Sequence, residues 1–187
     1  VVEKNVYTSQ LEGLKQPSYM VIKSGSEVTV HRGERLRTVY SIQRIVGEAI
    51  AAKERGLGAV IVYSGSCALG RSIRNRAGES IGYDELEERK RDAQAGEAQL
   101  KGLIHESSVK SAGEEPVFVD VTPEDFLDYV KRGEVVARCL TNTSKGRMVW
   151  VNEKDAQRRQ PYYDGPTFNE NDGLSSLLAQ GLNLYAP

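Results

Sequence analysis

The sequence AVIVYSGS, residues 59–66, decides the fold class of this chain. Its apolar part is continuous and rich in β-branched residues, and a Ser-Gly-Ser turn ends it abruptly. Uninterrupted runs of this kind are typical of parallel strands that helices cover on both faces. Before it, residues 35–55 carry apolar side chains at helical spacing, and Gly56 and Gly58 follow as stop signals. The stretch therefore predicts a buried parallel strand that follows a helix.

The same alternation continues in both directions along the chain. Thr122 and Pro123 are typical of a helix N-cap and first helical position, so a helix is expected directly after an apolar run. We predict further strands at 19–22, 117–121 and 148–151, and further helices at 84–107, from 123 to about 130, in a second stretch from there through 140, and from about residue 172. Strands that alternate with helices predict an α/β fold, a three-layer αβα sandwich with a mostly parallel sheet.

The composition is that of an ordinary globular domain. A chain of 187 residues can bury one good core, and 39% hydrophobic with 27% charged residues is average. The formal net charge of −1 gives no electrostatic reason to expect a nucleic acid or an anionic membrane as partner. No apolar run approaches the roughly 20 residues that a membrane helix needs. We expect a domain over residues 19–187, preceded by an extension over residues 1–18.

The cysteines and the N-terminus indicate a cellular compartment. Cys67 and Cys139 lie in apolar surroundings without the spacing of metal ligands, so we interpret them as buried small hydrophobes in a reducing environment. The first sixteen residues lack the basic-then-apolar pattern of a secretory signal. The sequence thus predicts a cytoplasmic protein.

Three loops follow predicted strands and are the candidate sites, since ligands of open α/β sheets bind beyond the carboxyl ends of the strands. The first loop is Lys23-Ser24-Gly25-Ser26, in which a cation stands beside a glycine that allows close approach to an anionic oxygen. A plain strand-to-helix turn is the alternative interpretation. The tetrapeptide by itself does not decide between the two.

The second loop, residues 64–66, joins hydroxyls and backbone N–H groups at the start of a helix, a combination suited to a carboxylate or a phosphate. The third, residues 152–155, places carboxylates after a strand, where they can orient an amine or a lysine. Serine and glycine are common in turns, and a solvated acidic turn is equally compatible with the third loop.

Several site classes lack their signatures. The second loop does not have the Gly-x-Ser-x-Gly spacing of a nucleophile elbow, and the pattern places neither His31 nor His105 near it, which argues against a Ser-His-Asp hydrolase. No Cys/His cluster indicates zinc, and no Walker loop indicates a P-loop nucleotide site. We predict no metal-ligating residues.

In their order along the chain, five segments resemble the amino-acid kinase family, in particular its glutamate 5-kinase branch. Residues 21–26 (VIKSGS) are similar to the opening strand and glycine loop, and residues 60–70 (VIVYSGSCALG) to the V-x-V-[TS]-S-G-A-x-x-x-G segment. Residues 90–97, 151–156 and 169–179 are similar to the K-Q-x-x-A-A-x-G-Q, I-N-E-N-D-A and D-N-D-x-L-S-A-x-x-A elements. The resemblance covers about residues 19–183.

The resemblance implies transfer of a phosphoryl group from ATP, accompanied by Mg²⁺, to the side-chain carboxylate of L-glutamate, the first step of proline synthesis. Phosphoryl transfer depends mainly on positioning and on neutralising negative charge. By resemblance, catalysis is assigned to Lys23 and Asp155, phosphate binding to Lys23, Gly25 and Ser26, and substrate binding to Ser64, Gly65, Glu134, Asn152 and Lys154. Asp155 would orient the lysine that binds the phosphate. The family also tends to assemble, so a homo-oligomer is a possible state.

The chain departs from the family pattern at several positions. Ser24 replaces the usual Leu, Ser66 the usual Ala, Lys154 the second Asn of N-E-N-D, and Glu170 the first Asp of D-N-D. The family's nucleotide lobe follows the last element, and the sequence ends at Pro187, so we expect that lobe to be largely missing from this chain. A non-catalytic amino-acid-binding or regulatory module, or an α/β domain without activity, is therefore the alternative to a kinase.

Overall fold

The structure is a computed structural model that describes residues 18–31, 33–74, 86–121, 129–153 and 170–184. Its strands are β1 (Tyr19–Ser24), β2 (Gly58–Tyr63), β3 (Val117–Val121) and β4 (Val149–Glu153). Its helices are α2 (Ser26–Thr29), α3 (Arg35–Glu54), α4 (Ser66–Ile73), α5 (Leu86–Ala112), α7 (Tyr129–Thr143) and α8 (Glu170–Leu184). Helices and strands alternate as the sequence predicts.

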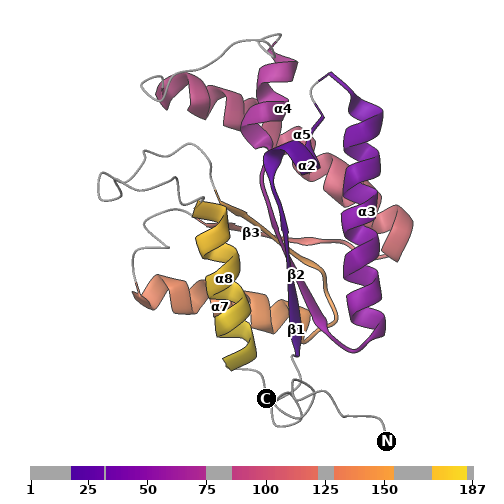
Figure 1. The fold of residues 1–187 in the computed structure, drawn as a ribbon, viewed down its shortest axis with the longest axis vertical. Helices are drawn as coiled ribbons and strands as arrows, with labels where there is room; N and C mark the ends of the chain where they lie inside the picture. The colour runs from indigo at the N-terminus through magenta and orange to yellow at the C-terminus, as the bar shows by residue number, and fades with distance from the viewer. Residues whose placement is uncertain (1–17, 32, 75–85, 122–128, 154–169, 185–187) are drawn as a thin grey trace, which may run out of the picture.

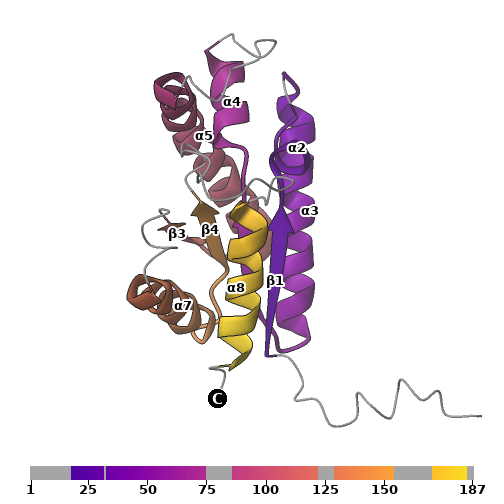
Figure 2. The ribbon, with the colours of Figure 1, turned by 60° about the vertical axis from the view of Figure 1, so that its left-hand side comes forward.

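The described strands form one parallel sheet in the order β1-β2-β4-β3. The strand that is last in the sequence therefore lies inside the sheet, between β2 and β3. All strands point the same way, so their carboxyl ends share one edge, the end toward α2 and α4 in Figure 2. We call this end the carboxyl edge.

Helices cover both faces of the sheet, which makes three layers (Figure 1). On one face, α3 and α5 pack on alternate strand residues such as Ile61, Tyr63 and Trp150. On the other face, α7 and α8 pack on the intervening residues, such as Val60 and Val62. The α/β class and the three-layer arrangement expected from the sequence are confirmed.

Helices α4 and α5 cross so closely that glycine is required on both. A Cβ at Gly70 would contact the backbone of Asp92, and a Cβ at Gly96 would lie 2.6 Å from the backbone nitrogen of Gly70. A glycine inside a helix costs about 1 kcal/mol relative to alanine. The close approach of the two backbones explains why α5 keeps a glycine at this position.

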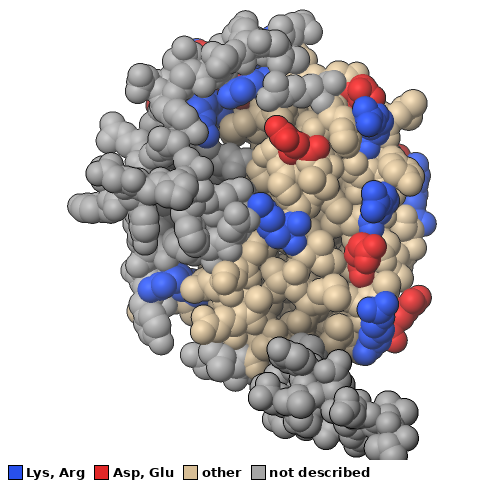
Figure 3. Space-filling model, viewed as in Figure 1, with Lys and Arg blue, Asp and Glu red and all other residues tan. Residues whose placement is uncertain are grey.

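Charges of both signs are interspersed along the side of α3 (Figure 3). The part of the same face over β1 and α8 consists largely of uncharged residues (Figure 3). Among the described helices, none is both long and apolar enough to cross a bilayer. Neither cysteine forms a disulfide; Cys139 is buried as expected, whereas Cys67 is only partly buried.

Candidate functional site at the carboxyl edge

The sheet brings the three predicted loops together. In the register of the sheet, Ser24 at the end of β1 pairs with Tyr63 at the end of β2, and Tyr63 pairs with Asn152 near the end of β4. The loops that follow β1 and β2 therefore start side by side, and Asn152 lies on the next strand. Residues more than a hundred positions apart in the sequence meet at one edge, the place where α/β sheets bind ligands.

Lys23 and Gly25 face a common space at the end of β1. The Nζ of Lys23, whose side chain is exposed, lies 3.9 Å from the position that a Cβ would take at Gly25. Because Gly25 has no side chain, this ammonium lies close to the bare backbone at the start of α2. A cation beside an uncovered backbone is the arrangement that suits an anionic oxygen.

Direct hydrogen bonds connect the first two loops. The hydroxyls of Ser26 and Ser64 lie 2.7 Å apart, and the backbone N–H of Ser64 donates to the carbonyl oxygen of Ser24 at 3.1 Å. On the buried side, the hydroxyls of Ser24 and Thr29 are 2.8 Å apart. The predicted phosphate loop and the predicted carboxylate loop thus form one connected unit.

Gly65 can be replaced by no other residue without strain. Its φ is 128°, in the region that side chains disfavour, and a Cβ there would approach Cγ2 of Val30 to 2.6 Å. The chain turns here from β2 into α4, so the hydroxyls of Ser64 and Ser66 stand on either side of the turn. The backbone conformation of Gly65 therefore makes the turn between β2 and α4.

Asn152 is buried, with 3% of its surface exposed, and its Oδ1 has no hydrogen-bond partner in the described chain. The predicted residues Lys154 and Asp155 lie outside the described residues. Glu134 is exposed on α7, and among the described residues it has no hydrogen bond or ion pair that connects it to the loops. The structure thus unites Lys23, the two serine loops and Asn152, but it does not bring Glu134 to them through a contact.

Sequence reasoning missed a polar group beside Asn152. Asp120, near the end of β3, is the partner of Asn152 on the side opposite Tyr63. The Nζ of Lys101 donates to both carboxylate oxygens of Asp120 at 2.9 Å and to Oε1 of Glu97 at 2.8 Å. An aspartate inside the apolar run 117–121 was the available signal, because strand interiors disfavour it.

Tyr63 faces this charged group. Burial raises the pKa of its phenol, and the charges of Asp120 and Glu97 raise it further. The pKa of Lys101 is also raised: burial alone would lower it, but its bonds to Glu97 and Asp120 outweigh the loss of water. A neutral phenol and a charged ammonium are thus the forms that this site holds near neutral pH.

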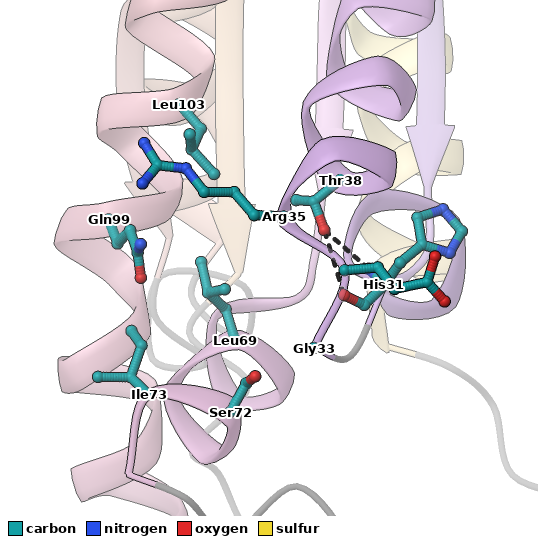
Figure 4. A pocket seen from close by; sticks show the side chains of 10 residues that line it. His31, Gly33, Arg35, Thr38, Leu69, Ser72, Ile73, Gln99 and Leu103 are labelled. Atoms are coloured by element: carbon teal, nitrogen blue, oxygen red, sulfur yellow. Dashed lines mark hydrogen bonds between the residues drawn. The ribbon is translucent and has the colours of Figure 1, made fainter.

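A separate cavity of about 160 Å³ lies between the start of α3 and the α4–α5 pair (Figure 4). Leu69, Ile73 and Leu103 give it an apolar wall, and Arg35 and Gln99 reach it from opposite sides (Figure 4). The imidazole of the nearby His31 bonds to Ser41 at 2.9 Å. Sequence reasoning did not predict this cavity, and it contains none of the predicted site residues.

Within the described ranges, no three His, Cys, Asp or Glu side chains gather as a metal site. No protein-family model matches the chain, and a search of curated proteins finds no match. The resemblance to the amino-acid kinase family therefore stays a prediction that rests on the motifs and on their positions.

Proposed function

We propose that this chain forms the amino-acid-binding lobe of an ATP-dependent kinase that acts on a side-chain carboxylate, of the glutamate 5-kinase type. One observation carries the proposal: Lys23, the Ser64 loop and Asn152 come from different strands and end at the same edge of the sheet. The proposed substrate is L-glutamate, and the pathway would be proline synthesis in the cytoplasm.

The residues at the end of β1 fit a phosphoryl group. The ammonium of Lys23 and the bare backbone at Gly25 can neutralise and approach anionic oxygens together. When bound, ATP with Mg²⁺ would supply the phosphoryl group; Lys23, Gly25 and Ser26 would hold its oxygens. The described residues form no metal cage, so Mg²⁺ would rely on phosphate oxygens and water, as it often does.

The residues of β2 and β4 would hold the amino acid. Ser64 can donate its hydroxyl proton to a substrate carboxylate while it accepts one from Ser26, because a hydroxyl both donates and accepts. Asn152 offers a buried amide whose oxygen is available to a ligand donor. This pre-arranged set would contribute by positioning the carboxylate toward Lys23.

Formation of a hydroxamate tests the proposal. The chain, together with the polypeptide that supplies its nucleotide lobe, is incubated with L-glutamate, ATP, Mg²⁺ and hydroxylamine, which traps an activated carboxylate. We expect product with the wild type and at least a hundredfold less with Lys23→Ala, about the loss of one charge-stabilising donor. The matched control is Lys145→Ala, an exposed lysine in the turn before β4, which should keep full activity. Activity retained by Lys23→Ala would overturn the assignment of this lysine.

The unpartnered Oδ1 of Asn152 also favours a second candidate, a non-catalytic amino-acid-binding module. Titration calorimetry with L-glutamate in the absence of ATP separates the candidates. Binding without hydroxamate identifies a binding module, and the absence of both identifies an α/β domain without this activity.

A further inference from the structure

The cavity beside the start of α3 has an apolar wall that reaches from the core to the surface. It lies between α3, α4 and α5, and it contains none of the residues of the candidate site (Figure 4). Leu69 and Ile73 of α4 and Leu103 of α5 form its apolar wall. Leu103 is only 5% exposed, whereas Ile73 is 44% exposed, so the cavity is closed at its base and open at its rim. A small molecule can therefore enter it from solvent.

The size of the cavity limits the ligand. Its volume of about 160 Å³ is close to that of engineered apolar cavities of about 150 Å³, which take up benzene. A hydrocarbon body of about four or five carbon atoms therefore fits against the apolar wall. A polar group attached to that body would lie at the rim, where the polar side chains are.

Hydrogen-bond donors from three helices reach this rim. Arg35 comes from α3, Ser72 from α4 and Gln99 from α5, and Arg35 and Gln99 lie on opposite sides of the cavity (Figure 4). Within the described ranges, none of these three side chains has a hydrogen bond or an ion pair with another residue. A guanidinium, a hydroxyl and an amide all donate hydrogen bonds, so together they suit a ligand group that accepts several.

The charge at the rim is positive. Glu34 also lines the cavity, but its carboxylate is bound to Arg37 at 3.2 Å. Glu106 of α5 is bound to Lys110 at 2.6 Å, and its pKa is lowered mainly by Lys110 and to a lesser extent by Arg35. Both acids thus have another cation as their partner. The charge of Arg35 remains available to an anionic ligand.

The start of α3 adds to this positive potential. The first turn of the helix carries no acidic residue, and the side chain of Glu34 does not cap it. The positive end of the helix dipole therefore lies at the cavity wall, and it favours an anion there. The imidazole of His31 is turned away from the cavity toward Ser41, with which it forms a hydrogen bond of 2.9 Å (Figure 4).

We propose that this cavity binds a small aliphatic monocarboxylate, with its hydrocarbon body on the apolar wall and its carboxylate on Arg35. A guanidinium can donate two parallel N–H bonds to one carboxylate, and Gln99 and Ser72 can donate to the remaining lone pairs. An amino acid fits less well, because the one described acid in the wall, Glu34, already has a partner and leaves no counter-charge for an ammonium. The inference is independent of the proposed kinase, whose residues lie elsewhere.

Methyl NMR spectra of the full chain test the assignment with three probes of similar shape. These are 3-methylbutyrate, its uncharged amide, and L-valine, which is 3-methylbutyrate with an added ammonium. We expect 3-methylbutyrate to shift the methyl signals of Leu69, Ile73 and Leu103 and to leave those of Leu178, on the opposite face of the sheet, unchanged. The amide should bind about tenfold more weakly because it has no charge, and L-valine about tenfold more weakly because its ammonium has no counter-charge.

Substitution of Arg35 tests the charge. Arg35→Met keeps much of the side-chain length without the guanidinium, so it should weaken the binding of 3-methylbutyrate about tenfold and remove the preference for the acid over the amide. Arg44→Met is the matched control, since Arg44 is an exposed arginine of the same helix that does not line the cavity. This control should leave the affinity unchanged.

Substitution of Ile73 tests the apolar wall. Ile73→Ala should weaken the binding of 3-methylbutyrate about fourfold, because it removes apolar contact worth about one buried methylene group. Val109→Ala is the matched control: Val109 is 40% exposed on α5, close to the exposure of Ile73, and it does not line the cavity. It should leave the affinity unchanged.

Each outcome decides the question. Shifts of the cavity methyl signals that Arg35→Met weakens and Arg44→Met preserves support the inference, whether or not any hydroxamate forms. The inference is overturned if 3-methylbutyrate causes no shift, if the amide or L-valine binds as tightly, or if the two arginine variants bind equally well. If Arg35→Met does not fold, the comparison of the acid with its amide on the wild type decides by itself.

Discussion

The two faces of the sheet have different chemistry. The face under α7 and α8 is aliphatic: its buried strand residues are all valines, and Leu178 of α8 packs on them. The face under α3 and α5 carries aromatic rings, with Tyr63 in edge contact with Trp150 at 5.7 Å and with Phe118 at 6.5 Å between ring centroids. Its Tyr63 hydroxyl and Trp150 indole nitrogen are buried without described partners.

This difference separates a purely aliphatic face from a face whose packed core also holds polar atoms. Valines fill a sheet surface well and leave no polar atom to satisfy. The aromatic face gives up some stability, because its polar atoms lose water without gaining a partner. Proteins tolerate such local conflicts mainly at functional sites.

The largest effect is expected from a cavity in the aliphatic face. Leu178→Ala should lower the free energy of unfolding by about 2–5 kcal/mol, because Leu178 is fully buried and its removal leaves a void. Urea denaturation measures the loss. Leu36→Ala makes the same change at a position that is 86% exposed, and it should stay within about 0.5 kcal/mol. Similar losses in the two variants would contradict the described core.

The second effect concerns the helix crossing that covers the aromatic face. Gly96→Ala should lower the free energy of unfolding by about 1–3 kcal/mol, because the new Cβ meets the backbone of α4, which cannot move aside easily. Gly102→Ala is the control on the same helix, since open space surrounds its Cβ position. It should raise stability by up to about 1 kcal/mol through helix propensity. If both variants changed the free energy of unfolding in the same direction, the close crossing of α4 and α5 would be disproved.

A paired exchange of hydroxyls tests the comparison directly. Val62→Thr adds a hydroxyl to the aliphatic face and should lower the free energy of unfolding by about 1–3 kcal/mol. Tyr63→Phe removes one from the opposite face and should raise it by about 1 kcal/mol, since the hydroxyl has no described partner. Urea denaturation curves of both variants show whether each substitution lowers or raises the free energy of unfolding. A loss of stability in Tyr63→Phe would show that its hydroxyl is satisfied within the fold.

The smallest effect is chemical and leaves the fold unchanged. Burial raises the pKa of the Cys139 thiol to about 12, so at pH 8 it should resist iodoacetamide until the protein unfolds. Cys67 is partly buried, with its Sγ 3.5 Å from the carbonyl oxygen of Arg89, and should react faster. Mass spectrometry of the alkylated peptides measures the two rates. Faster labelling of Cys139 would contradict its place in the aliphatic core.

The sequence predicted the elements well where the pattern was strong. The helix expected at residues 35–55 is α3, Arg35–Glu54, and the strand expected at 59–63 is β2, Gly58–Tyr63. The long helix was predicted over 84–107, but α5 extends to Ala112, because alanine and serine near its end give no stop signal. The helix start predicted at Pro123 lies outside the described residues.

The candidate site was predicted in part. Lys23, Ser64 and Asn152 could be found because each follows an apolar run, and strand ends are where α/β proteins place their ligands. Tyr63 ends a predicted strand and Lys101 falls within a predicted helix, and the sequence pattern assigned neither residue to the site. Both residues lie near Asp120, and the strand of Asp120 joins the sheet beyond β4.

By itself, the sequence determined the order of helices and strands, the parallel sheet and the glycine-containing turns, because these follow from local periodicity and backbone preference. Only the tertiary structure decided that β4 enters between β2 and β3, that Ser26 meets Ser64, and that Tyr63 faces Asp120 and Glu97. These contacts join residues separated by dozens of positions. These contacts form because the folded chain buries some side chains and brings charges together, and a local sequence pattern cannot predict either.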